Sequence, residues 1–72
     1  MSDYKPYPPH TVENVGNKVS WYRFENQTLA EQGAQAAKHN ANVMWNQGYD
    51  FGFMNPGDIN KNQDGSFTVV VP

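Results

Sequence analysis

The chain has 72 residues, no cysteine and a formal net charge of −2. This length predicts one domain near the lower limit of what folds alone, and the lack of cysteine excludes a disulfide framework and a thiolate metal site. Its five basic residues are scattered along the chain. Without a basic patch to neutralise phosphates, nucleic acid is a poor candidate as a partner. No apolar run approaches the roughly 18 residues of a membrane span, and no signal peptide is visible, so we expect a cytoplasmic protein.

The first ten residues differ from the rest in composition. Residues 2–10 hold three prolines and two tyrosines, Tyr4 and Tyr7, which favour an extended arm over helix or sheet. We therefore divide the chain into an arm over residues 1–10 and a single α+β domain over residues 11–72. Two interpretations of the arm stay open: a frayed tail, as chain ends usually are, or a segment that packs its tyrosines on its own core or on a partner.

The first element of the domain is extended. Residues 18–25 are rich in aromatic and β-branched side chains, which predicts a strand. Gly16-Asn17 before it is a favoured two-residue hairpin loop, because glycine supplies the positive φ that a type II′ turn needs first. The loop allows an additional N-terminal strand over the residues that precede it.

A helix is predicted over about residues 29–47. Thr28 and Glu31 match a capping box at its start, and Gly48 suits a left-handed cap at its end. The spacing of the small and apolar side chains puts them on one stripe, and a stripe of alanines allows close approach to large side chains on a sheet. The stripe consists of Ala30, Ala34, Ala37, Ala41, Met44 and Trp45.

The last third of the chain predicts two more strands. Residues 49–54 alternate strictly in polarity, and Phe67, Val69 and Val71 alternate with Thr68 and Val70. Asn55-Pro56-Gly57-Asp58 between them suits a type II turn. The sequence thus predicts a small β-α-β-β domain, with an antiparallel-rich sheet and one helix on one face.

Residues 58–65 invite comparison with a calcium loop, because oxygen-bearing side chains recur at every second position and end on Asp64-Gly65. An EF-hand loop also needs a bidentate glutamate at its twelfth position. That position is Val69 when counted from Asp58 and Val71 when counted from Asn60. The favoured interpretation is a polar connection into the last strand, and a calcium-binding module is retained as an alternative.

No other motif predicts chemistry. The two histidines, His10 and His39, have no metal-ligand spacing, and no nucleophile elbow or phosphate loop is present. We expect no catalytic residues, no metal site and no cofactor, and hence a protein that is not an enzyme. Short length, an amide-rich surface and the lack of catalytic motifs resemble small accessory proteins, including those of phages; the resemblance is one of size and composition.

The aromatic residues of the predicted strands indicate where a partner binds. One helix covers one face of a sheet, so side chains on the other face are expected to be uncovered, and apolar patches with aromatic residues mark interfaces. The sequence therefore predicts a protein-binding inhibitor or adaptor that occupies a partner's surface, with a homo-oligomer that assembles through the same face or a sheet edge as the alternative. The predicted contacts are Trp21, Arg23, Met54 and Val70, with Tyr4 and Tyr7 as secondary contacts.

Overall fold

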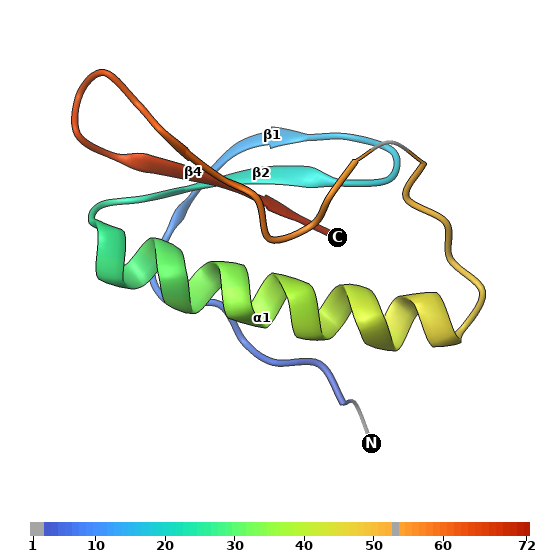
Figure 1. The fold of residues 1–72 in the computed structure, drawn as a ribbon. Helices are drawn as coiled ribbons and strands as arrows, with labels where there is room; N and C mark the ends of the chain where they lie inside the picture. The colour runs from blue at the N-terminus through green and yellow to red at the C-terminus, as the bar shows by residue number, and fades with distance from the viewer. Residues whose placement is uncertain (1–2, 53) are drawn as a thin grey trace.

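In the computed structural model, which describes residues 3–52 and 54–72, one helix covers one face of a four-stranded antiparallel sheet (Figure 1). The strand order is β1-β2-β4-β3. This arrangement confirms the predicted α+β domain, including the additional N-terminal strand. None of the helical structure in the described residues is long and apolar enough to cross a membrane. In chain order the elements are β1 (Thr11–Val15), β2 (Ser20–Phe24), α1 (Gln27–Asn46), β3 (Ile59–Lys61) and β4 (Phe67–Val71).

The β1–β2 hairpin turns one residue later than the sequence predicted. Residues 16–19 connect the two strands, and the N–H of Gly16 donates to the carbonyl of Val19 over 2.9 Å, which leaves Asn17 and Lys18 at the tip of the loop. Gly16 is not among the glycines with positive φ, and the predicted type II′ turn is therefore wrong. The second strand is also shorter than residues 18–25, because Lys18 and Val19 belong to this connection.

Helix α1 begins two residues earlier than predicted. Its cap is Asn26, whose side-chain oxygen accepts from the Leu29 N–H over 2.9 Å; the predicted capping box at Thr28 and Glu31 is wrong. Asparagine satisfies the same orphan N–H groups as threonine and is the better cap, so it starts the helix first. At the other end Gly48 has a φ of 98°, which agrees with the predicted left-handed termination.

The main core lies between α1 and the central strands. Phe24, Val69 and Val71 from the sheet are fully buried against the helix. Gly33 makes this approach possible, because a Cβ built on it would lie 2.4 Å from Cζ of the Phe24 ring. The glycine that weakens the isolated helix therefore allows its docking. The helical residues in this core are Ala30, Ala34 and Ala37; Trp45, predicted for the same stripe, is 61% exposed.

The predicted strand over residues 49–54 is wrong. Gly48 and Gly52 both have positive φ, which extended strands do not use, and the Asp50 carboxylate accepts from the Gly52 N–H over 2.9 Å to form a local turn. Phe51 from this irregular segment is buried with Val19 and Val70, not in the core under the helix. Phe53, predicted to face the helix, lies outside the described residues.

The polar stretch 58–65 holds more structure than the predicted connection. Residues 59–61 form β3, which pairs with β4 at the outer edge of the sheet, while residues 62–65 form the expected turn, with Gly65 at a φ of 90°. The type II turn at 55–58 agrees with prediction: Asp58 donates its N–H to the Asn55 carbonyl over 3.1 Å, and Gly57 has a φ of 97°.

The N-terminal arm packs along α1, so the frayed-tail interpretation is wrong for residues 3–10. Asn40, only 4% exposed, accepts from the Lys5 N–H over 2.7 Å and donates to the Lys5 carbonyl over 3.0 Å. The same amide donates to the Tyr7 hydroxyl over 3.1 Å. One buried side chain thus holds the backbone of an extended segment as a neighbouring strand would.

Aromatic contacts extend the docking of the arm onto the sheet. The Tyr7 ring packs edge-on to Tyr22 at 5.3 Å between centroids, and the His10 ring stacks on Tyr22 at 4.2 Å. The His39 imidazole forms a hydrogen bond of 2.7 Å to the Asp3 carbonyl, and since a carbonyl only accepts, the ring donates. Burial raises the pKa of the Tyr7 phenol, which marks it as part of the packed structure.

Candidate functional site

Strand β1 is the least covered element of the molecule. All five of its residues are exposed, and α1 packs on β4, β2 and β3 without reaching it. Among the described residues no strand pairs with its outer side. Val12 and Val15 consequently remain 52% and 72% exposed. We refer to β1 together with the outward side chains of Trp21 and Arg23 on β2 as the hairpin edge.

A β-bulge sets the side-chain directions of β1. Val12 pairs with Tyr22 and Val15 with Ser20, and the register shifts between Val12 and Asn14. Since directly paired residues share a face, the shift places both valines, three positions apart, on the face that carries α1. In a regular strand they would lie on opposite faces. The bulge therefore gathers two exposed apolar side chains on one side of a bare strand.

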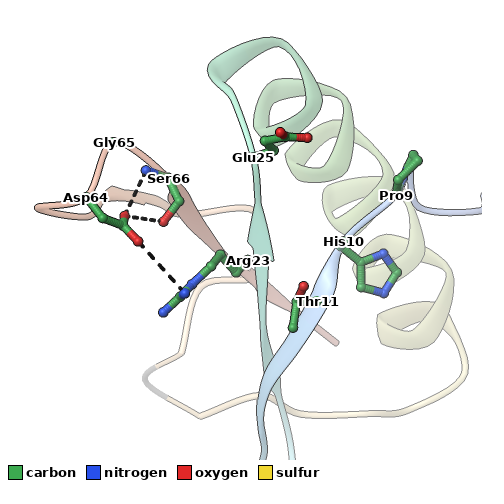
Figure 2. A pocket seen from close by; sticks show the side chains of 8 residues that line it. All are labelled: Pro9, His10, Thr11, Arg23, Glu25, Asp64, Gly65 and Ser66. Atoms are coloured by element: carbon green, nitrogen blue, oxygen red, sulfur yellow. Dashed lines mark hydrogen bonds and ion pairs between the residues drawn. The ribbon is translucent and has the colours of Figure 1, made fainter.

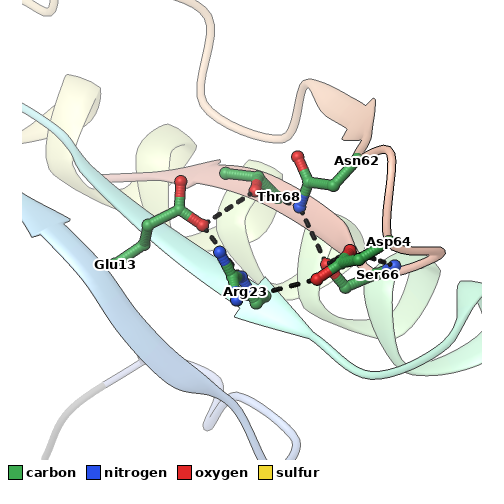
Figure 3. A network of polar contacts seen from close by, with 6 residues as sticks. All are labelled: Glu13, Arg23, Asn62, Asp64, Ser66 and Thr68. Carbon is green, nitrogen blue, oxygen red and sulfur yellow. Dashed lines mark hydrogen bonds and ion pairs between the residues drawn. The ribbon is translucent and has the colours of Figure 1, made fainter.

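The opposite face of the hairpin edge carries a polar network (Figure 3). The Arg23 guanidinium lies 3.1 Å from the Glu13 carboxylate and 3.9 Å from that of Asp64. Thr68 donates its hydroxyl to Glu13 over 3.2 Å. Arg23 and its carboxylates are all partly solvated, so the pairs orient these groups more than they stabilise the fold.

The turn before β4 completes this network. The Asn62 amide donates to the hydroxyls of Ser66 and Thr68 over 3.0 and 2.9 Å. The Ser66 hydroxyl and N–H donate to the Asp64 carboxylate over 2.6 and 2.9 Å. These two hydrogen bonds, with a smaller contribution from Arg23, lower the pKa of Asp64. Asp64 therefore keeps its negative charge well into the acid range.

A groove of about 550 Å³ runs across the strand ends beside this network (Figure 2). Arg23 and Asp64 lie on one side of the β1–β2 ribbon and His10 on the other, so the groove bends around the start of β1. Glu25 in its wall has no ion-pair partner among the described residues. Glu13 and Asp64 pair with Arg23, and with Glu25 counted as well the formal charge of these four residues is −2. The lining residues are Pro9, His10, Thr11, Arg23, Glu25, Asp64, Gly65 and Ser66.

The predicted contacts Trp21, Met54 and Val70 come together in one cluster. Val70 is only 5% exposed, however, and Trp21 and Met54 are partly buried around it. The prediction that this end of the far face is uncovered is therefore wrong, because residues 49–54 supply Phe51 and Met54 to the cluster. Of these three residues, Trp21 alone also adjoins β1, through its pairing with Asn14.

The other predicted contacts lie apart from one another. Arg23 is on the same face as Trp21, two residues along β2, and is exposed within the polar network. Tyr7 is half-buried under the arm, and Tyr4 donates its hydroxyl to Gln47 over 3.1 Å near the end of α1. The two tyrosines belong to the arm's docking on α1, not to the hairpin edge.

Three residues of interest were missed at the level of sequence. Val12, Glu13 and Val15 are three of the five exposed residues of β1, and the predicted hairpin loop at Gly16 was the available signal for that strand. Their exposure could not be read from the pattern, because it depends on how far α1 extends over the sheet.

The geometry offers no clear metal centre in residues 3–52 and 54–72, where no three histidine or carboxylate side chains gather closely enough to hold an ion. Asp64 of the 58–65 stretch accepts from the Ser66 N–H and hydroxyl. The alternative of a calcium-binding loop stays a prediction.

No family model, curated protein or solved structure matches the chain. A function for it is therefore inferred from the arrangement of its own residues, among which the hairpin edge combines exposed apolar side chains with charged ones.

Proposed function

We propose that this protein is a non-enzymatic binding module that acts by occupying the surface of a partner protein, as an inhibitor or an adaptor. The hairpin edge is the contact surface, with Trp21 and Arg23 as its anchors. A cytoplasmic location belongs to the same proposal.

One observation carries the proposal: α1 stops short of β1 and leaves a whole strand, with two exposed valines, outside the folded core. Small proteins gain stability by burying apolar side chains, and an apolar strand left uncovered marks a surface used in binding. Trp21 and Arg23 adjoin this strand, and tryptophan and arginine are the residue types that most often dominate binding energy.

Self-association is the second candidate, because an unpaired strand edge can also pair with another copy of the chain. Sedimentation at micromolar concentration separates the two candidates. A monomer removes the homo-oligomer; a stable dimer whose formation needs β1 replaces the proposal.

The test is capture of binding proteins from the source cell, with the intact chain compared with Trp21→Ala. Loss of an anchor of this type weakens binding by about 2 kcal/mol or more. Trp45→Ala is the matched control, since Trp45 is exposed on α1, away from the hairpin edge. We expect Trp21→Ala to lose the partner and Trp45→Ala to retain it. A folded Trp21→Ala protein that keeps every interaction would refute the proposed surface.

A further inference from the structure

We propose that the partner contributes an extended segment that pairs with β1 as a fifth strand, with apolar side chains on the helix-bearing face and lysine or arginine on the other face. This inference rests on the proposed function and specifies its mode of binding and its partner chemistry.

The first argument is the state of the backbone. β1 is bound to β2 on one side, and its other side faces no strand of the described chain. Backbone groups along an open edge are a template for an added strand, and main-chain hydrogen bonds supply affinity in that mode of recognition. β3, the other edge, has three residues against five for β1.

The second argument is the apolar face. The bulge brings Val12 and Val15 to the same side, where α1 leaves them exposed. A strand lying beside β1 would place every second side chain against these valines. The partner segment must therefore carry apolar residues at alternate positions.

The third argument is charge. Glu13 points to the other face, as its contacts with Arg23 and Thr68 show. Together with Glu25 and Asp64 it gives this region a surplus of two negative charges over Arg23. A lysine or arginine on the added strand would lie cross-strand from Glu13, and the next side chain on that face, two residues along, would lie towards the groove at Thr11. Opposite charges across neighbouring strands stabilise the pair, whereas like charges oppose it.

The same charge argues against a second copy of this chain as the occupant. An antiparallel pair of two β1 strands would bring two Glu13 side chains towards each other at its centre. The negative charge thus favours a strand that carries basic residues and disfavours a second β1 strand.

The experiment uses the intact chain and a short peptide that alternates valine and lysine. We expect the peptide to shift the backbone amide resonances of residues 11–15 and Arg23 at concentrations up to about 1 mM, the range of weak strand addition. Two matched peptides test the two parts of the inference: glutamate in place of lysine tests charge, and N-methylation of alternate backbone amides tests strand pairing. Both are expected to lose the shifts.

Variants of the chain localise the site. Val15→Lys is expected to weaken peptide binding about tenfold, as loss of one buried valine would. Glu13→Gln is expected to weaken it about two- to fivefold. Ile59→Lys on the opposite edge is the control and is expected to leave binding unchanged.

Several results would overturn the inference: no shift at about 1 mM peptide, equal shifts with the lysine and glutamate peptides, shifts with the N-methylated peptide, or shifts centred on residues 59–61. If the amide resonances of residues 11–15 shifted with protein concentration in the absence of peptide, β1 would instead pair with a second copy of the chain. A captured partner that depends on Trp21 but leaves β1 amide exchange unchanged would retain the binding module and reject strand addition. Absence of any Trp21-dependent partner would reject the proposed function itself.

Discussion

The internal strand β4 and the edge strand β1 are covered to very different extents. At β4, valines lie beneath α1 at close range, and every buried side-chain polar atom in the described residues has a hydrogen-bond partner. At β1, valines of the same type lie in solvent and one backbone edge faces no other strand. The difference follows from one helix of limited width: it covers the centre of a four-stranded sheet and makes no contact with the edge strand β1. The buried core and the proposed binding surface thus lie on different strands.

The arm covers a further part of the surface of α1. It crosses α1 from the side away from β4 and buries Ala36 and Asn40, which would otherwise be exposed on the helix. It then reaches the sheet through Tyr7 and His10, which cover Tyr22. The helix thus packs against the sheet on one side and against the arm on another. Strand β1 makes no contact with α1, and all of its residues are exposed.

The largest expected effect tests how tightly α1 packs on the central strands. Gly33→Ala would improve helix propensity by up to about 1 kcal/mol but force a methyl group against the buried Phe24 ring, and overpacking costs about 1–3 kcal/mol. We expect a net loss of about 1–2 kcal/mol in the free energy of unfolding, measured in urea. Gln35→Ala, an exposed position on the same helix, should not destabilise the protein.

A second substitution makes the Gly33 result diagnostic. Phe24→Leu shortens the side chain that the new methyl group meets, so it should cost less in the Gly33→Ala background than in the wild-type chain. If the two losses simply added, the close approach of helix and ring would not be the cause.

An intermediate effect is expected where the arm docks. Asn40→Ala removes three hydrogen bonds, but the exposed Lys5 groups can bond to water instead, so we expect a loss of about 1 kcal/mol. Release of the arm should also speed chymotrypsin cleavage after Tyr4. Asn42→Ala, the same substitution at an exposed site two residues away, is the control; equal cleavage of both variants would mean that Asn40 does not hold the arm.

The smallest effect is a dependence on alkaline pH. Burial raises the pKa of Tyr7 above the ordinary value of 10.0, so the neutral phenol is favoured in the folded state. Its contribution is fully present below the unfolded pKa and is lost as pH rises through the folded pKa. The urea midpoint should therefore fall above about pH 10 more steeply in the wild type than in Tyr7→Phe. Parallel pH profiles would show that Tyr7 is not buried in solution.

Local sequence determined the elements whose signals are themselves local. The alanine pattern and Gly48 specified α1 to within two residues, the alternating valines specified β4, and Pro56-Gly57 specified the type II turn before β3, because periodicity, left-handed φ and proline act over a few neighbouring residues. The same reasoning failed at residues 49–54, where alternation in polarity imitated a strand. There the conformations of Gly48 and Gly52, and burial of Phe51 in a second cluster with Val19 and Val70, prevailed over the pattern.

Tertiary structure alone decided which surfaces remain open. Trp21 and Arg23 could be selected by residue type, but burial of Val70 and exposure of Val12 and Val15 depend on where residues 49–54 and α1 come to lie. The role of Asn40 likewise exists only because an arm 35 residues earlier in the chain meets it. Sequence periodicity specifies the faces of each element. Contacts between distant segments decide which of those faces is covered, and here they left β1 bare.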